Sequence, residues 1–377
     1  MKYKICDLMN INRGASPRPI IEYLTDNGYR WLKISDFSLG DRYVYKTKEY
    51  IKEEGITKTK FLKKGTLILT NSATPGIPIF LGEDMCLHDG FLYFQNIKEK
   101  IISKEYLYYW FIFNRNNIVN QANGSVFKNL KKEIVMNLSI SLPSLNTQKK
   151  VVKILDSITR KIETNNQTND NLYELGDALY KEYYSKYENE LPNGYKYLNL
   201  NEVSVNFDSK RKPMSSRERE QHKGIYPYYG ATSIIDYVDD YIFDDTYLLM
   251  GEDGTVKTKE GYPVLQYIWG KSCINNHTHV LQGTIISTEY LMFALRKKNI
   301  ETLITGAVQP KINQVNMNKI KIIIGTDEVN KKFEEKIKII VAKIKANTIE
   351  NETLIQLRDT LLPKLMNGEI DLDKIEI

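Results

Sequence analysis

Residues 151–179, VVKILDSITRKIETNNQTNDNLYELGDAL, decide the fold, and a related stretch, FEEKIKIIVAKIKANTIENETLIQLRDTL, follows 182 positions later at residues 333–361. Positions alternately four and three apart read Val, Leu, Ile, Ile, Asn, Asn, Leu, Gly and Leu in the first stretch. The second reads Phe, Ile, Ile, Ile, Asn, Asn, Leu, Arg and Leu. This spacing predicts a single apolar seam along each of two helices. Because 147–187 lacks proline and 328–366 contains only Pro363, each is predicted to be one helix of about 40 residues and roughly 60 Å.

The 182-residue offset also relates the segments that precede the helices, and it holds without a gap over about 55 residues. The paired positions there are Gly124-Ser125-Val126 with Gly306-Ala307-Val308, Leu130 with Ile312, Leu138 with Ile320, and Ile140 with Ile322. A period this long is typical of a duplicated domain with its helix, and it is too long for a solenoid repeat. Nearly the whole chain is therefore predicted to be two copies of one structural plan.

Outside the helices, short apolar runs are interrupted by Gly, Pro, Asn and Asp, which is typical of strands and turns. The predicted strands are 66–70, 91–94, 241–243, 247–250 and 319–324, and the predicted shorter helices are 104–115 and 288–298. We expect an α/β (α+β) fold in which two mixed globules are separated by two long antiparallel coiled-coil helices, as a pseudo-two-fold internal repeat. The predicted parts are a globule at 1–146, a helix at 147–187, a globule at 188–326, a helix at 327–368 and a tail at 369–377.

The predicted helix seam contains a polar layer in both copies. Its apolar and polar members are Ile158, Ile162, Asn165 and Asn169 in the first helix, and Ile340, Ile344, Asn347 and Asn351 in the second. Antiparallel helices would place Asn165 opposite Asn351 and Asn169 opposite Asn347. A buried layer of this kind costs stability and fixes register. The alternative is a solvated kink at this point of each helix.

Composition excludes several classes of protein. The longest strongly apolar run, Leu107 to Phe113, is too short to cross a bilayer, and the first residues contain no apolar core of a signal peptide. Three scattered cysteines predict neither a disulfide framework nor a zinc knuckle. We therefore expect a soluble, cytoplasmic protein without membrane contact.

Charge is divided unevenly along the chain, although the total is only +6. Residues 1–146 carry 21 basic and 14 acidic side chains, a net charge of +7, whereas residues 188–326 carry 16 of each. Segments 147–187 and 327–377 have net charges of +1 and −2. The first globule is therefore expected to attract phosphates more strongly, and the near-neutral helices suit protein partners.

Catalytic, cofactor-binding and metal-binding patterns are not found. The chain lacks adjacent prolines, and so lacks the Asx-Pro-Pro-aromatic motif of amino methyltransferases. Gly270-Lys271-Ser272 has Leu265 where a phosphate loop requires glycine. Cys273, His277 and His279 lack a fourth ligand for zinc, which favours polar contacts or packing. The acidic loop 251–257 resembles a nuclease or cation loop. A nuclease needs a further acid and a lysine that one loop cannot show, so a hairpin turn that presents Thr255 and Lys257 is the favoured interpretation.

Polar and basic loops in both globules instead favour recognition of nucleic acid. Arginine reads guanine, and asparagine or glutamine reads adenine, by paired hydrogen bonds in the major groove. The segment Asn12–Pro19 and its counterpart Asp208–Pro213 are the most basic of these loops. The candidate contacts are Arg13, Arg18, Asn71, Ser72, Thr74, Lys210, Arg211, Lys212, Tyr229, Thr255, Lys257, Asn276, His277, Gln309 and Lys311. For any one of them the alternative is an ordinary solvated surface loop.

The order globule, helix, globule, helix resembles the specificity subunit of type I restriction–modification enzymes. The helix motifs that carry the resemblance are 142–150 (LPSLNTQKK), Ile154-Leu155-Asp156, Lys161-Ile162 and 357–370 (LRDTLLPKLMNGEI). The globule motifs are 31–36 (WLKISD), 124–126 (GSV), 227–230 (PYYG), Gly254-Thr255 and 309–313 (QPKIN). These motifs add Lys33, Ser35 and Lys128 to the candidate DNA contacts. Two places depart from the family pattern. One is Phe127-Lys128, where the second copy has Gln309-Pro310. The other is the opening of the second helix, 328–333, which lacks a counterpart of Gln148.

The resemblance implies a non-catalytic subunit in which each globule is a target recognition domain for one half of a bipartite sequence in double-stranded DNA. It implies that the helices set the spacing and dock two methyltransferase subunits, which carry S-adenosylmethionine and modify adenine. Restriction subunits, which use ATP and Mg²⁺, can join them; no cofactor is expected in this chain. The tail 369–377 is expected to add a strand to the first globule and close the molecule circularly. The alternatives are a stand-alone DNA-binding regulator or decoy and, less favoured, a nuclease.

Overall fold

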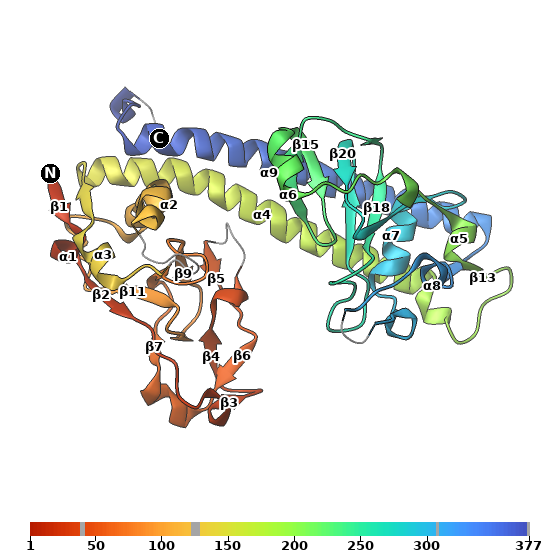
Figure 1. Cartoon of the computed structure of the whole chain (residues 1–377), viewed down its shortest axis with the longest axis horizontal. Helices are drawn as coiled ribbons and strands as arrows, with labels where there is room; N and C mark the ends of the chain where they lie inside the picture. The colour runs from red at the N-terminus through yellow and green to blue at the C-terminus, as the bar shows by residue number, and fades with distance from the viewer. Residues whose placement is uncertain (38–41, 122–128, 307–308, 375–377) are drawn as a thin grey trace. The chain divides into compact units, whose positions relative to one another are not determined.

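The computed structural model describes residues 1–37, 42–121, 129–306 and 309–374. The chain divides into two compact units: the first unit comprises residues 1–163 and 351–377, and the second unit comprises residues 164–350. The two long helices in Figure 1, α4 (Leu145–Tyr183) and α9 (Asp327–Met366), each contribute one part to each unit. Each unit therefore combines one globule with a segment of both helices. No helix among the described residues has the length and apolar character needed to cross a membrane.

The first unit contains three described sheets, with the strand orders β1-β12, β3-β6-β4-β10-β7 and β2-β11-β8-β9-β5. Both faces of the last of these sheets are covered by packed side chains. The strands are β1 (Lys2–Lys4), β2 (Asn10–Arg13), β3 (Leu24–Thr25), β4 (Tyr29–Leu32), β5 (Tyr43–Val44), β6 (Glu49–Ile51), β7 (Lys60–Leu62), β8 (Leu67–Thr70), β9 (Pro78–Leu81), β10 (Met85–Leu87), β11 (Phe91–Gln95) and β12 (Ser139–Ser141), and the helices are α1 (Ile5–Leu8), α2 (Lys104–Asn120) and α3 (Lys132–Asn137). Leu67 and Leu69 pack toward α2, whereas Ile68 between them packs toward the neighbouring sheet, as the two-residue period of a strand requires.

The second unit repeats this plan. Its described sheets have the strand orders β13-β22, β14-β21-β18-β19 and β16-β15-β20-β17. The strands are β13 (Lys196–Asn199), β14 (Ser204–Asn206), β15 (Lys223–Tyr229), β16 (Ile234–Val238), β17 (Phe243–Asp244), β18 (Tyr247–Gly251), β19 (Leu265–Ile268), β20 (Lys271–Ile274), β21 (Thr278–Gly283) and β22 (Lys321–Ile324), and the helices are α5 (Leu200–Val203), α6 (Ser216–Gln221), α7 (Thr288–Arg296) and α8 (Gln314–Met317). The order β14-β21-β18-β19 matches β2-β11-β8-β9, and the parallel pair β15–β20 matches β4–β10.

Backbone hydrogen bonds confirm the 182-residue repeat. Ile5 N donates to Leu138 O at 3.0 Å in the first unit, and Leu200 N donates to Ile320 O at 2.9 Å in the second. Leu138 and Ile320 are one of the pairs predicted from the sequence. The repeat segments 124–126 and 307–308 lie outside the described residues.

Most predicted elements are present, with one exception among the strands. The predicted strands 66–70, 91–94, 247–250 and 319–324 correspond to β8, β11, β18 and β22, and the predicted short helices correspond to α2 and α7. The prediction for 241–243 is wrong at its start, because β17 begins only at Phe243. Asp240 Oδ1 accepts a hydrogen bond from Tyr241 N at 2.8 Å, and the chain meets β20 only from Ile242, whose N donates to Ser272 O at 3.1 Å.

The long helices run antiparallel in the second unit. Asn347 Nδ2 donates to Asn169 Oδ1 at 2.8 Å, and the ring of Tyr180, further along α4, lies 6.0 Å from the ring of Phe333, which is earlier in α9. The buried seam residues are Ile158, Asn165, Ile340, Ile344, Asn347 and Asn351, whereas Ile162 and Asn169 are half-buried. Asn165 Nδ2 donates to Glu350 Oε2 at 2.8 Å, and its pairing with Asn351 stays a prediction.

Gly176 explains an irregularity in the predicted seam. It is buried in the middle of α4, where glycine is otherwise unfavourable. A Cβ atom at this position would lie 2.1 Å from the ring of Phe293 in α7. The missing side chain therefore allows α7 to pack directly on α4.

A buried ion pair joins the first globule to its helix. Arg42 Nη1 donates to Asp156 Oδ1 of α4 at 2.5 Å, and Tyr109 OH of α2 donates to the same oxygen at 2.8 Å. The Arg42 side chain is 2% exposed. Its guanidinium lies 5.4–5.7 Å from the ring centroids of Tyr43, Phe80, Tyr108 and Tyr109. Burial alone would lower the pKa of Arg42, but the hydrogen bond to Asp156 together with the charge interactions with Tyr109, Asp156 and Tyr43 outweighs burial, and the pKa is raised.

The ionic contacts that join the second globule to its helices are more exposed than the Arg42–Asp156 pair. Arg296 Nε of α7 donates to Asp177 Oδ1 of α4 at 2.9 Å, and the arginine side chain is 28% exposed. Lys345 of α9 lies 5.2 Å and 5.4 Å from the ring centroids of Tyr267 and Trp269. The two junctions therefore differ in both residues and burial.

The tail does not form the predicted strand over its described residues 369–374. Leu372 and the two residues after it form the short 3-10 helix η7 (Leu372–Lys374). The Leu372 side chain lies in the core of the first unit, and Lys150 Nζ donates to its carbonyl at 2.9 Å. The strand that pairs with β12 is β1 instead, so the edge position that the tail was expected to fill is already occupied.

Candidate nucleic-acid interface

In the second unit, loops from distant parts of the sequence meet beside the ends of β14, β18 and β21. Glu252 N donates to His277 O at 2.9 Å, and Ile312 N donates to Glu252 O at 2.9 Å. Gly254 N donates to Pro310 O at 3.0 Å. These bonds tie together residues 252–257, 275–277 and 309–312, and Lys212 N, which donates to Ile274 O at 3.0 Å, adds residues 207–212. We call these four segments the second loop cluster. Strand ends fix these loops on a rigid sheet, a common arrangement for binding surfaces.

The first unit contains the equivalent first loop cluster, formed by residues 13–18, 71–74, 88–90 and 129–130. Asn71 N donates to Gly90 O at 2.9 Å, and Leu130 N donates to Asn71 O at 2.8 Å. These two bonds correspond to the bonds that Glu252 makes in the second loop cluster. Asn71 and Glu252 therefore occupy the same position in the two copies.

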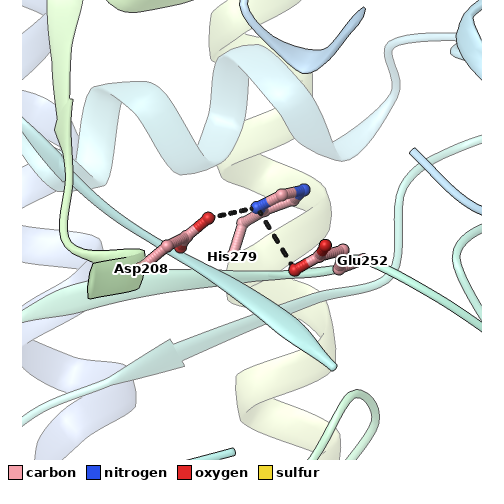
Figure 2. A group of neighbouring side chains, drawn as sticks. All are labelled: Asp208, Glu252 and His279. Atoms are coloured by element: carbon pink, nitrogen blue, oxygen red, sulfur yellow. Dashed lines mark hydrogen bonds and ion pairs between the residues drawn. The ribbon is translucent and has the colours of Figure 1, made fainter. Parts of the chain in front are cut away.

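The interior of the second loop cluster is a network of charged side chains. Figure 2 shows His279 of β21 pointing toward Asp208 and Glu252, with Nδ1 at 2.6 Å from Asp208 Oδ2 and 3.8 Å from Glu252 Oε2. Arg211 Nη1 donates to Glu252 Oε2 at 2.6 Å. Lys311 Nζ lies 3.1 Å from Glu252 Oε1. Both carboxylates are thus neutralised by cations from other loops.

The carboxylates of this network are stabilised in their ionised forms. Burial alone would raise the pKa of Asp208, but hydrogen bonds from His279 and from Val280 N hold the pKa below its ordinary value. Burial likewise opposes ionisation of Glu252, and hydrogen bonding from Arg211 together with the charge of His279 lowers its pKa. In both cases favourable partners outweigh desolvation.

The same three residues are close enough to share a cation, since one ligand atom from each of Asp208, Glu252 and His279 lies within 4.8 Å of the others. Arg211 and Lys311 already supply positive charge to this pair of carboxylates. The chemistry therefore fits an internal ion network better than a metal site.

The three residues that the sequence analysis considered as zinc ligands have separate partners. Cys273 Sγ contacts Asp240 O at 3.4 Å, His277 Nδ1 lies 2.6 Å from Asp253 Oδ1, and His279 points to Asp208. They do not converge on one point.

The remaining candidates of the second unit divide by exposure. Lys210, Lys212, Thr255, Asn276, His277, Gln309 and Lys311 are exposed, whereas Arg211, Tyr229 and Lys257 are half-buried. Lys257 pairs with Glu301, and Tyr229 O accepts from Asn275 N at 3.0 Å. The exposed group provides the polar atoms best placed to meet a ligand.

In the first loop cluster, Asp89 is the shared centre. Arg13 Nε donates to Asp89 O at 2.7 Å, Ser16 Oγ donates to Asp89 Oδ1 at 3.0 Å, and Asn71 Nδ2 donates to Asp89 O at 3.4 Å. Arg13 remains exposed, but Asn71 is only 4% exposed. Asn71 is therefore placed to support the cluster from within.

The other candidates of the first unit lie around this centre. Arg18 and Ser35 are exposed, and Ser72 and Thr74 are half-buried. Lys33 pairs with Glu49 and lies 5.6 Å from the ring of Trp31, which itself contacts His88 beside the cluster. Lys128 lies outside the described residues.

Sequence reasoning identified the basic members of both clusters and missed their acidic partners. Asp208, Glu252 and Asp89 bind arginines of the predicted set, yet they are separated from them by 3, 41 and 76 residues. The glycine-flanked pair Glu252-Asp253 was the available signal, because charged side chains in a tight loop require partners nearby.

Comparisons with known proteins agree with this duplicated architecture. A family model described as "Type I restriction modification DNA specificity domain" matches residues 1–174 and again residues 192–358. The type I restriction enzyme MjaIX specificity subunit of Methanocaldococcus jannaschii is 22% identical, with 99% of this chain and 94% of that protein covered. The type I restriction enzyme HindI specificity subunit of Haemophilus influenzae is 22% identical, with 72% and 78% covered.

A solved structure has the same fold. The type I restriction-modification S subunit from M. genitalium superposes with a TM-score of 0.57 at 16% identity, covering 97% of this chain and 95% of that one. Since the family model covers most of the chain in two successive copies, this chain belongs to the specificity-subunit family of type I restriction–modification systems.

Proposed function

We propose that this chain is the non-catalytic DNA-recognition subunit of a cytoplasmic type I restriction–modification complex. Each loop cluster reads one half of a bipartite double-stranded target, and α4 and α9 set the distance between the halves. The observation that carries the proposal is the repetition of one loop cluster on identical backbone bonds but with different side chains. Two such surfaces suit two different half-sequences.

The exposed polar side chains of the clusters are the proposed DNA contacts. In the first cluster these are Arg13 and Arg18, and in the second they include Lys210, Lys212, Asn276 and Gln309. Arginine and amide groups can form paired hydrogen bonds with base edges, and the lysines suit phosphates. The excess of positive charge in the first globule makes its contribution to affinity the more sensitive to salt.

The helices are the proposed docking surface for two methyltransferase subunits. Their near-neutral charge, +1 for 147–187 and −2 for 327–377, offers little attraction to DNA and suits a protein interface. S-adenosylmethionine belongs to those subunits, and ATP and Mg²⁺ belong to restriction subunits when these join. No cofactor is assigned to this chain.

Sequencing of N6-methyladenine in cells with and without the gene tests the proposal. We expect a bipartite motif that disappears with the gene. Exchange of residues 188–326 for another recognition domain should change one half of the motif only. If loss of the gene leaves methylation unchanged and the chain purifies without a methyltransferase, the chain is a separate DNA-binding regulator or decoy. Cleavage of DNA by the purified chain with Mg²⁺ would indicate a nuclease.

A further inference from the structure

We infer that the ion network of the second loop cluster is a positioning device, in which Arg211, Glu252, Asp208 and a doubly protonated His279 hold the reading loops in place. Arg211 is then a positioning residue, although its place in the basic segment Asp208–Pro213 had predicted a direct contact with a DNA base. The inference rests on the proposed function, because it concerns how one half of the target is read.

One connected network reaches every loop of the cluster. Arg211 follows β14, and it donates from Nη1 to Glu252 Oε2 at 2.6 Å, to Thr278 O at 3.0 Å and to Asn276 O at 3.3 Å. His279 Nε2 lies 2.8 Å from Ile312 O, in the loop that contains the exposed Gln309 and Lys311. Movement of any loop would therefore break a bond to another.

The partners of His279 define its protonation state. A backbone carbonyl only accepts hydrogen bonds, so Nε2 must carry a proton to bind Ile312 O. Nδ1 faces the carboxylates of Asp208 and Glu252 at 2.6 Å and 3.8 Å, and these carboxylates already act as acceptors, from Val280 N at 2.8 Å and from Arg211 Nη1 at 2.6 Å. With acceptors on both sides, the ring fits as an imidazolium, and it is only 1% exposed.

Arg211 has few donors left for a base. Besides the three bonds from Nη1, its Nε donates to Asp208 O at 2.9 Å, and Nη2 lies 3.7 Å from Asp208 Oδ2. The side chain is 15% exposed. Reaching a guanine would leave Glu252 without its strongest partner in a half-buried site, which is unfavourable.

The first loop cluster shows that the fold does not itself require this network. The strand registers and the bonds of Asn71 and Glu252 place Leu92 where the second copy has His279, and Arg13 where it has Asp208. Leu92 is completely buried and uncharged. Charge at this position is therefore a property of the second reading surface, which supports a role in recognition.

A double-mutant cycle on the full chain, in its complex, tests the inference. We expect Arg211→Gln and Glu252→Gln each to relax the second half of the methylated motif and to weaken binding of the target duplex by about tenfold or more, while the first half stays unchanged. The double variant should be impaired by clearly less than the sum of the two single effects, because the two substitutions share the loss of the Arg211–Glu252 bond. Lys210→Gln, an exposed neighbour, is the matched control and should weaken binding without changing the motif.

A base-reading role for Arg211 makes a different prediction. Arg211→Gln would then change one position of the motif, and Glu252→Gln, which releases the arginine, would leave the motif intact. That result would overturn the inference. Absence of any bipartite motif with the unaltered chain would instead count against the proposed function, so the two failures are distinguishable.

Nitrogen-15 NMR of the ring nitrogens gives a measurement that does not depend on folding of a variant. The chain has 4 histidines, and His279→Gln, or His279→Leu as at the equivalent position of the first cluster, assigns the signal. From the two acceptors that face the ring, we expect both nitrogens of His279 to carry protons. An unprotonated nitrogen would contradict the network as described.

Discussion

The two units place their buried charge in opposite regions. In the first unit a buried arginine, Arg42, joins the globule to α4 through Asp156, whereas the ion pair of the first loop cluster, Arg13–Asp89, is more exposed and the apolar Leu92 lies at the position of His279. In the second unit the buried charge lies inside the second loop cluster, around His279. The half-buried pair Arg296–Asp177 joins the second globule to α4. Duplication has conserved the backbone hydrogen bonds and left the ionic contacts free to diverge.

This difference suggests a different rigid region in each unit. The first globule is held firmly on its helix, where an unpaired Arg42 or Asp156 would be strongly destabilising. In the second globule, the ion network holds the loops of the second loop cluster firmly to one another. The following variants test this contrast, in order of expected effect.

The largest effect is expected from Asp156→Ala in the first unit. Removal of the carboxylate leaves Arg42 charged and 2% exposed among aromatic rings, so we expect a loss of about 3–5 kcal/mol in the free energy of unfolding. Urea denaturation measures this loss. Tyr109→Phe, which removes one hydrogen bond to the same carboxylate, should cost only about 1 kcal/mol. A cost below that of Tyr109→Phe would contradict the buried-pair interpretation.

Leu372→Ala tests whether the tail stabilises the first unit and not the second. Leu372 is buried in the core that includes Val151 and Leu155, so we expect a loss of about 2–3 kcal/mol. Deletion of 369–377 should cost at least as much. Hydrogen exchange should show the change in the first globule and not in 188–326; an unchanged melting profile of the deletion variant would contradict a structural role for the tail.

The asparagine layer of the helix seam is expected to have a smaller effect, of opposite sign. Replacement of Asn165, Asn169, Asn347 and Asn351 by Leu should raise the melting temperature by about 2–4 °C and loosen the register of the helices. Asn347→Leu alone should lower the melting temperature, because Asn169 loses the partner that donates to it. Calorimetry distinguishes the two cases, and a lower melting temperature for the fourfold variant would argue against the layer.

Arg296→Ala, in the junction of the second unit, should have the smallest effect. Since the arginine is 28% exposed and its charge is screened by solvent, we expect a loss of about 0.5–1 kcal/mol. Added salt should reduce this loss further and should leave the cost of Asp156→Ala nearly unchanged. Equal costs for the two variants would remove the contrast between the junctions.

The repeated features were accessible from the sequence because they depend on local pattern. The 4-3 spacing predicted α4 and α9, and the 182-residue offset paired Leu138 with Ile320, which accept the same backbone bond in the two units. Gly176 was visible as an irregularity, but its cause, the ring of Phe293, required the packing of α7.

The ionic contacts could not be predicted, because each joins residues whose proximity depends on the whole fold. Arg42 and Asp156 are 114 residues apart, and Arg211 and Glu252 are 41 apart. For this reason Arg211 was grouped with exposed basic residues, although its guanidinium is directed inward. The tail was expected to add a strand to the first globule, but its described residues form η7, and the strand that pairs with β12 is β1.

The aromatic enclosure of Arg42 also has a kinetic consequence. Separation of the first globule from α4 must break the ion pair before water can reach the guanidinium, since Tyr43, Phe80, Tyr108 and Tyr109 surround it. Until water enters, a separated Arg42 would have neither its partner nor hydration, which is unfavourable. We therefore expect this globule to separate only slowly from its segment of α4, so that the first unit keeps one internal geometry.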